Sequence, residues 1–389
     1  MKAIKLKENV YWVGVIDWNL RDFHGYSTSR GGTYNAYLII DEKVTLIDNV
    51  YEPFASQMIS RIKSVIDPSK IEVYISNHSE PDHSSGIKEI IKYAPNVQIY
   101  ASAPAGVRSM MGIYHDINVL PVKTNDIINI GKRDLTFIQT PLVHWPDNMV
   151  TYSKYDKILF SNDMLGQHVA SFERFDDEID FYVLKDELKK YYANIVLPYG
   201  MQTQRALKQI KGLEMDMIAP SHGVIWRKYI KEALDIYEKM STYQKEEKAV
   251  VVYDSMWGST EKMAVEVADA FVEVGIPTVI RHVRHTPLSE IIVDLMDAKY
   301  LAVGSPTLNN GLMTSIASFF AYMKGLNPKN ISYVVYGSYG WSGQGTEFAD
   351  AELESMGHTR LMKPIRIQYA PTEEQLKNLK DEIAQAIKG

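Results

Sequence analysis

The residues of this chain best suited to chemistry form a short cluster, H-x-E-x-D-H, at positions 78 to 83. The cluster directly follows the apolar run 71–75, which is typical of a buried strand. Imidazoles and carboxylates crowded at the end of one strand form a ligand set for two metal ions. A zinc hydrolase with the related motif H-x-H-x-D-H would carry histidine at the position of Glu80. Because a carboxylate makes the site harder and more anionic, the pattern favours iron over zinc.

Three later polar residues share this context. Each follows a short hydrophobic run, as expected of a ligand held at the carboxyl end of a strand on a rigid sheet. The candidate metal ligands are therefore His78, Glu80, Asp82, His83, His144, Asp163 and His222. Four neutral imidazoles and three carboxylates would largely balance two divalent ions, with Asp163 able to bridge them. No metal role is assigned to His24, His115, His282, His285 and His358, since a lone histidine after a strand is more often a hydrogen-bonded structural residue.

Composition narrows the possible functions. A length of 389 residues allows two or three domains, and a net charge of -6 with a pI near 6.0 argues against a general nucleic-acid binder. No stretch approaches membrane-spanning length and the N-terminus has no signal core, so a cytoplasmic protein without a membrane partner is expected. Cysteine is absent, which excludes disulfides, thiolate metal sites and thiol catalysis. Redox chemistry would therefore need a bound cofactor, or iron with nitrogen and oxygen ligands.

The N-terminal part combines short strands with interspersed helices, which predicts an αββα sandwich rather than a regular alternation. The expected strands are 10–17, 34–40, 44–48, 71–77, 97–101, 134–139, 149–153, 157–161 and 216–219. The expected helices are 52–66, 85–93, 104–111, 180–213 and 227–240. A polar segment at 241–248 is typical of a linker, so the first domain is predicted to span residues 1–247.

From residue 249 the pattern changes to strict strand, loop and helix. Strands are expected at 249–253, 277–281, 299–303, 331–336 and 364–369, and the run 249–253 is apolar throughout, as in a parallel strand covered on both faces. Thr372 and Gln375 form the pattern of a capping box that opens the last helix. Residues 248–389 are therefore predicted to form a five-stranded, doubly wound α/β domain of flavodoxin type.

Three loops of this second domain indicate a phosphate-bearing cofactor. The loop 255–260 carries three hydroxyls and a glycine between the first strand and a helix N-terminus, where amide groups and the helix dipole favour a phosphate. Since neither a triphosphate loop nor a dinucleotide motif is present, FMN fits best. The loops 304–311 and 337–343 follow later strands at the same rim of the sheet. The candidate FMN residues are Ser255, Met256, Trp257, Gly258, Ser259, Thr260, Ser305, Pro306, Thr307, Asn309, Gly337, Ser338, Tyr339, Gly340 and Trp341. For the two aromatic residues, stacking on the flavin and packing of an exposed loop are equal alternatives.

With these motifs in order, the chain resembles the flavodiiron proteins, also called A-type flavoproteins, over essentially its whole length. The resemblance implies a metallo-β-lactamase-like domain followed by a flavodoxin-like domain, with two non-haem irons and FMN. It assigns His78, Glu80 and His144 to one iron, Asp82, His83 and His222 to the other, and Asp163 to both. The segments 22–25 and 33–37 also resemble the family, which places His24 near the metals, although a structural role is at least as well supported. His168, Tyr191 and Tyr192 are expected among the neighbouring groups, with His24 and His168 as catalytic residues.

The implied activity is reduction of O₂ to water, or of NO to N₂O, with electrons passed through FMN. Since cysteine is absent, a fused rubredoxin domain is not expected and the donor is expected to be external. The segments 141–147 and 161–168 resemble the methanogen enzymes that oxidise reduced coenzyme F-420, and a separate rubredoxin is the competing donor. A head-to-tail homodimer, or a dimer of such dimers, would bring FMN to the irons of the partner.

Two other functions remain open at this stage. One is a hydrolase of the metallo-β-lactamase type. Glu80 argues against it, as does the flavin domain, because hydrolysis requires no flavin. A pure electron-transfer flavodoxin with a degenerate metal domain is opposed by the complete ligand set. Flavin absorption, together with iron rather than zinc in the purified protein, would favour the flavodiiron oxidoreductase over both alternatives.

Overall fold

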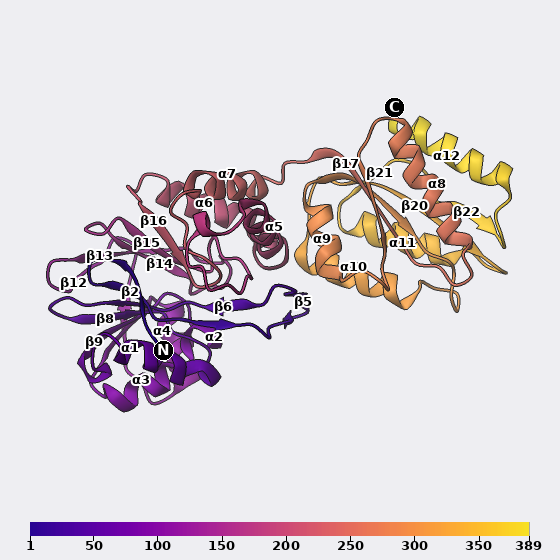
Figure 1. Ribbon diagram of the computed structural model, residues 1–389. Coiled ribbons are helices and arrows are strands. Elements are labelled where there is room, and N and C mark those ends of the chain that lie inside the picture. Colours follow the sequence, from indigo (N-terminus) through magenta and orange to yellow (C-terminus); the bar gives the residue numbers. More distant parts are fainter. Residues whose placement is uncertain (389) are drawn as a thin grey trace. The chain divides into compact units, whose positions relative to one another are not determined.

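The computed structural model describes residues 1–388, which fold into two compact units (Figure 1). The first unit comprises Met1–His24, Thr28–Tyr192 and Tyr199–Ser241. The second comprises Gly25–Ser27, Ala193–Pro198 and the chain from Thr242 onward. None of the described helices combines the length and the apolar character that crossing a bilayer would require.

Two sheets face each other in the first unit. The seven-stranded sheet has the order β1 (Ile4–Lys7), β2 (Val10–Trp12), β7 (Tyr37–Ile39), β8 (Val44–Ile47), β9 (Ile71–Ser76), β10 (Gln98–Ser102) and β11 (Val119–Val122). The five-stranded sheet has the order β12 (Ile127–Asn129), β13 (Asp134–Gln139), β14 (Met149–Ser153), β15 (Ile158–Asn162) and β16 (Met217–Pro220). Side chains of both sheets, among them Trp12, Ile75, Phe137 and Phe160, form one buried cluster, so this cluster is the interior of a sandwich.

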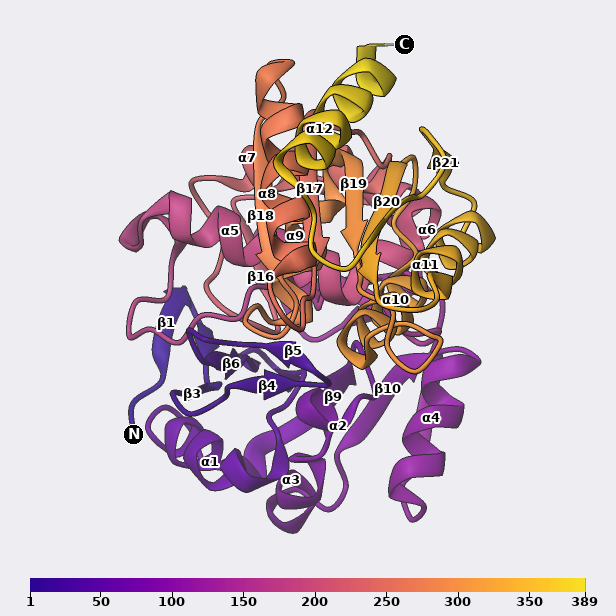
Figure 2. The ribbon, with the colours of Figure 1, turned by 90° about the vertical axis from the view of Figure 1, so that its right-hand side faces the viewer.

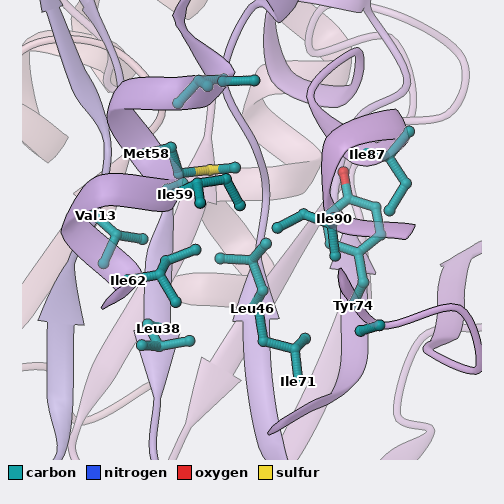
Figure 3. Packing of buried hydrophobic residues seen from close by; sticks show 14 of the residues in the cluster. Val13, Leu38, Leu46, Met58, Ile59, Ile62, Ile71, Tyr74, Ile87 and Ile90 are labelled. Carbon is teal, nitrogen blue, oxygen red and sulfur yellow. The ribbon is translucent and has the colours of Figure 1, made fainter. Parts of the chain in front are cut away.

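Helices cover the two outer faces of this sandwich (Figure 1). The helices α1 (Ala55–Lys63), α3 (Ile87–Tyr93) and α4 (Ala105–Tyr114) pack on the seven-stranded sheet. Figure 3 shows Met58, Ile62 and Ile90 of this layer against Leu46 and Tyr74 of the strands. The helices α5 (Phe181–Tyr191), α6 (Gly200–Ile210) and α7 (Ile230–Ser241) lie on the side of the other sheet. The predicted αββα architecture is therefore confirmed.

Several element boundaries differ from the sequence prediction. The single helix expected at 180–213 is two helices, α5 and α6, separated by a π-helical turn at Tyr192–Val196 and a 3-10 turn at Leu197–Tyr199. Pro198 explains the interruption, because proline lacks an amide donor and disfavours helical geometry in the residue before it. The strands expected at 10–17 and 34–40 are each divided, into β2 and β3 (Val15–Asp17) and into β6 (Gly32–Tyr34) and β7. Gly14 marks the first division: a Cβ there would lie 2.4 Å from the carbonyl oxygen of Tyr34.

The second unit is built on a parallel sheet. Its strand order is β18 (Thr278–His282), β17 (Glu246–Tyr253), β19 (Ala298–Gly304), β20 (Ser332–Tyr339) and β21 (Thr359–Arg360). A sixth strand, β22 (Ile365–Gln368), also pairs with β20. The fifth strand expected at 364–369 is thus present as β22, and β21 is an additional short strand. The order 2-1-3-4-5 is that of a flavodoxin-like fold, so the predicted fold class is confirmed.

Helices lie on both faces of this sheet. The helices α8 (Ser259–Glu273) and α12 (Glu373–Lys388) pack together with the sheet in one buried cluster and stand in front of it in Figure 2. The helices α9 (Leu288–Met296) and α10 (Thr314–Leu326) lie on the opposite side, and α11 (Gln344–Ser355) precedes β21 (Figure 1). The capping box is confirmed, because Gln375 N donates to Thr372 Oγ1 at 3.2 Å and Thr372 N donates to Gln375 Oε1 at 3.0 Å. Since α7 ends at Ser241 and β17 begins at Glu246, the polar segment between the elements is shorter than expected.

Candidate metal centre and flavin pocket

The H-x-E-x-D-H cluster spans the turn after β9 and a short helix, α2 (Pro81–Ser84), which contains Asp82 and His83. At the end of β9 the Asn77 amide donates to Asp48 Oδ1 at 2.8 Å, which holds the start of the turn. Pro81 is the first residue of α2, a position that favours proline because its missing amide proton is not needed there. The strand end and this helical turn therefore present all four candidate ligands within six residues of chain.

The other three candidate ligands come from the five-stranded sheet. His144 lies in the loop between β13 and β14, Asp163 directly follows β15, and His222 follows β16. Because β15 and β16 pair in parallel, their carboxyl ends lie at the same edge, and Asp163 and His222 meet there although they are far apart in sequence. The sheet topology explains why separated sequence positions converge.

All seven candidate ligands come together in two groups. The donor atoms of His78, Glu80, His144 and Asp163 lie within 4.8 Å of one another, as do those of Asp82, His83 and His222. Asp163 lies between the groups: its Oδ2 is 3.3 Å from His144 Nε2, and its Oδ1 is 2.9 Å from His83 Nε2. One carboxylate therefore faces both groups, one oxygen toward each, as a bridging ligand would.

The spacing and burial of these atoms fit metal ions. Nitrogen-to-oxygen distances within the groups run from 2.9 to 3.6 Å, close to the ~3 Å between neighbouring ligands at about 2.1 Å from one ion. Among the described residues, both carboxylate oxygens of Asp82, Nε2 of His83 and Oδ2 of Asp163 are buried without a hydrogen-bond partner. Buried charged oxygens without partners are costly, and a bound cation removes that cost.

The pKa shifts of the candidate ligands also fit a site for cations. Burial opposes ionisation of His83, but Asp82 and Asp163 outweigh it and raise the pKa of His83 to about 9. Burial would likewise raise the pKa of Asp163, yet His83, His144 and His78 hold it well below its usual range. The Asp163 carboxylate is thus ionised at neutral pH, and its negative charge can be balanced by metal ions in place of protons.

His24 and His168, expected beside the metals, occupy different positions. His24 Nε2 lies 3.1 Å from Glu80 Oε1, and its side chain is 68% exposed on the turn between β4 (Asp22–Phe23) and β5 (Tyr26–Ser27). The His168 ring is fully buried, 4.7 Å from the ring of His222, and burial together with His222 holds its pKa well below the usual value. His24 is therefore the solvent-facing neighbour of the site, and His168 is part of its wall.

The two tyrosines expected near the metals, Tyr191 and Tyr192, lie in different surroundings. The Tyr191 ring is 5.3 Å from His168 and 5.8 Å from His222, so Tyr191 lies beside the metal ligands. The ring of Tyr192 instead packs edge-on against Tyr237 at 4.9 Å, in the turn that follows α5. Of the pair, only the ring of Tyr191 packs against a candidate ligand in these contacts.

Asp147 was missed by the sequence reasoning. Its carboxylate accepts hydrogen bonds of 2.7 Å from both the amide and the hydroxyl of Ser79 and lies 3.1 Å from His78 Nδ1. A usable signal was present, since Asp147 follows His144 in the same loop and carboxylates commonly support metal-binding histidines. Ser221, whose hydroxyl donates to Asp163, was missed as well.

The second unit contains a cavity of about 340 Å³ at the carboxyl ends of β17, β19 and β20. It is lined by Ser255, Met256, Trp257, Ser259, Pro306, Thr307, Leu308, Asn309, Ser338, Tyr339, Gly340, Trp341 and Tyr369. The 15-residue helix α8 begins at this cavity, preceded by Gly258 with a left-handed φ of +84°. The Thr260 hydroxyl lies 2.9 Å from that of Ser338, which ties the helix start to β20. A helix N-terminus surrounded by hydroxyls fits the phosphate of FMN.

Most of the predicted flavin residues line this cavity, and the exceptions lie around it. Gly258, Thr260, Ser305 and Gly337 are absent from the lining, although they belong to the same loops and strand ends. Gly337 is needed for a close approach, since a Cβ there would lie 2.0 Å from the carbonyl oxygen of Ser305. Leu308 and Tyr369 line the cavity and were not predicted.

The fold and the two sites agree with what comparison with known proteins shows. Residues 33–223 match the family model of the ODP family beta lactamase, and residues 251–382 match that of flavodoxin. The chain is 38% identical to the nitric oxide reductase of Moorella thermoacetica over 96% of both chains.

Two solved structures extend this result to the whole fold. The rubredoxin oxygen:oxidoreductase of Desulfovibrio gigas superposes with a TM-score of 0.96 at 38% identity, over 99% of this chain and 98% of that one. The flavodiiron protein of Giardia intestinalis superposes with a TM-score of 0.96 at 34% identity, over 100% of this chain and 96% of that one. The chain belongs to the flavodiiron protein family. It is thus an oxidoreductase whose cofactors are a non-haem diiron centre and FMN.

Proposed function

We propose that the protein reduces O₂ to water at its diiron centre, with electrons that pass through FMN from an external donor. The observation that carries this proposal is the position of Asp163 between two groups of buried histidines and carboxylates. His78, Glu80 and His144 would hold one iron and Asp82, His83 and His222 the other, while Asp163 directs one carboxylate oxygen toward each group. When bound, the irons supply two electrons and the site for the gas, and reduced FMN supplies two more.

Residues around the centre have separate parts in this proposal. His24 contacts Glu80 and faces solvent, so it is placed to carry protons to the site. His168 is buried and kept neutral against His222, so it excludes water and fixes the orientation of that ligand. In the flavin domain, the loop 255–260 holds the phosphate, and Tyr339 and Trp341 flank the ring. For the boundary between the two domains we propose residues 247 and 248, within the first residues of β17, a few positions after the compact first unit ends at Ser241.

Metal and flavin content test the central proposal. The purified protein is expected to hold about two irons and one FMN per chain, with the visible absorption of oxidised flavin. Reoxidation of the reduced protein by O₂, followed by stopped flow, should be complete without release of peroxide. Stoichiometric zinc without flavin in the native protein would contradict the proposal.

Reduction of NO to N₂O is the second candidate activity. It is supported by the Moorella thermoacetica relative, which is named a nitric oxide reductase, while the Desulfovibrio gigas relative is named an oxygen oxidoreductase. Rates of reoxidation by each gas, measured on the same reduced preparation, decide between the two. A faster reaction with NO, with N₂O as product, would reverse the order proposed above.

For the electron donor we propose reduced coenzyme F-420, with a separate rubredoxin as the alternative that the name of the Desulfovibrio gigas relative supports. Anaerobic mixing with reduced F-420 should bleach the flavin with no other protein present. Bleaching by reduced rubredoxin alone would select the alternative. Either donor diffuses freely, which accords with the cytoplasmic location expected from the sequence.

We further propose that two chains associate head to tail, so that the flavin of one subunit serves the irons of the other. Support comes from large aromatic side chains exposed around the flavin cavity: Trp257 is 93%, Trp341 82% and Tyr369 68% exposed. A mixture of a His83→Ala variant with a Thr260→Asp variant should regain activity in mixed dimers. Mixed dimers that form without any activity would favour transfer within one chain.

A further inference from the structure

The carboxylate of Asp147 lies directly behind the candidate ligand His78. Both side chains are buried, at 2% and 0% exposure, and His78 Nδ1 lies 3.2 Å from Oδ1 and 3.1 Å from Oδ2 of Asp147. The amide and hydroxyl of Ser79 each donate to Oδ2 at 2.7 Å, and the Ser102 hydroxyl donates to the main-chain oxygen of Asp147 at 2.6 Å. Side chain and main chain of Asp147 are therefore both held in place.

This contact determines how His78 meets a metal. Since an ionised carboxylate only accepts hydrogen bonds, Nδ1 must carry the proton and Nε2 must present its lone pair. His78 Nε2 indeed faces the first group, 3.2 Å from Glu80 Oε2 and 3.5 Å from Asp163 Oδ2. A carboxylate behind an imidazole also raises the ring's strength as a metal ligand.

In the described part of the chain, no carboxylate accepts a hydrogen bond from Nδ1 of His83 or His222 in the second group. His222 Nδ1 lies 2.7 Å from the main-chain oxygen of Thr33, which is a neutral acceptor. Nδ1 of His83 is buried and has no hydrogen-bond partner among residues 1–388. In ligand type the groups are alike: each has two histidines and one carboxylate of its own, and they share Asp163. In these hydrogen bonds, a charged acceptor behind a histidine thus distinguishes the first group from the second.

We propose that Asp147 is a positioning residue that makes the two metal positions unequal. The position of His78, Glu80 and His144 binds its ion more tightly and fills first, and the position of Asp82, His83 and His222 fills second. This inference rests on the proposed function for the presence of two metal ions, and it is independent of which gas is reduced.

A metal titration of the full-length protein with FMN bound tests this order. Metal is removed with a chelator, and Co²⁺ is added without oxygen while its ligand-field absorption and a competing chelator report each binding step. The wild type should show two separated steps. In Asp147→Asn, which keeps the shape but loses the charge, the first step should weaken roughly 10- to 100-fold and approach the second. Asp147→Glu should recover part of the separation.

Asp156→Asn is the matched control. Asp156 is a buried carboxylate in the turn between β14 and β15, at the opposite end of β15 from Asp163, and its oxygens accept hydrogen bonds from Arg133 and Ser153 instead of an imidazole. This variant should keep both steps apart. Two steps with wild-type spacing in Asp147→Asn, or an equal weakening of both, would overturn the inference. A wild type that binds no metal would overturn the proposed function as well.

Discussion

The hydroxyl of Ser221 donates a 2.9 Å hydrogen bond to Oδ1 of Asp163. The two residues follow the adjacent parallel strands β16 and β15, and this contact fixes the rotation of the carboxylate that faces both groups of metal ligands. Without a defined rotation, Asp163 could not hold one oxygen toward each group. The strand pairing and one hydroxyl therefore determine the geometry between the two metal positions.

Replacing Asp163 by asparagine should remove most of the bound iron while FMN stays bound, since the two sites lie on separate elements of the chain. The amide has no charge to balance the cations and presents only one oxygen. Iron and flavin per chain, measured on the same preparation, check this outcome. Ser221→Ala, which leaves the carboxylate but frees its rotation, should lose less iron. Full iron content in Asp163→Asn would remove this residue from the centre.

The contact between the hydroxyls of Thr260 and Ser338 leads to a prediction for the flavin. Thr260→Val keeps the volume but removes a donor at the start of α8, so FMN should bind several-fold more weakly. Thr260→Asp adds a negative charge there and should abolish binding, because the charge repels the phosphate. Fluorescence titration with FMN measures both. Thr278→Val, whose hydroxyl bonds to the Ile276 carbonyl at the other end of the sheet, should bind FMN like the wild type.

His358 provides a prediction about pH. Burial, with Lys245 and Lys329 nearby, lowers the pKa of His358 to about 4. In the unfolded chain its pKa is about 6.5, so the unfolded state binds the proton more readily. The free energy of unfolding should therefore fall as the pH drops from about 6.5 toward 4. A His358→Gln variant should lose less stability over that interval, as measured by urea unfolding at several pH values. An identical pH dependence in both proteins would contradict this account.

The capping box at the start of α12 should contribute measurably to the stability of the flavin-binding unit. Thr372→Ala removes the acceptor for the Gln375 amide and is expected to cost about 1 kcal/mol. Ser355→Ala is the control, since that exposed hydroxyl only bonds back to the Glu352 carbonyl within α11. Its effect should stay within about 0.5 kcal/mol. Denaturant unfolding of both variants measures the difference.

The grouping of the candidate metal ligands was largely predictable because they follow apolar runs that are easy to recognise in sequence. Asp163 and His222 lie just past the ends of two strands that pair in parallel, and His144 lies in the loop after β13. Asp147 was not predictable in the same way. Its contact with His78 depends on how the loop between β13 and β14 folds back over the turn after β9, which no periodicity records.

In the rest of the fold, features with a local sequence pattern were likewise predictable, and features set by tertiary structure were not. The core strands and the capping box at Thr372 were found because their patterns are local. The break at Tyr192–Val196 was missed, since the apolar spacing continues through it. Tyr369 was missed for another reason: it follows β22 with a left-handed φ of +63°, and only the turn there directs it to the flavin cavity.

The wall of the flavin cavity contains no lysine, arginine, histidine, aspartate or glutamate among the described residues. A phosphate held there is stabilised by amide dipoles and hydroxyl groups rather than by opposite charges. Ionic screening acts on charges separated through solvent and has little effect on hydrogen bonds inside a closed loop. FMN should therefore remain bound in concentrated salt, and mechanical opening of the loop, rather than ionic strength, should govern how fast it leaves.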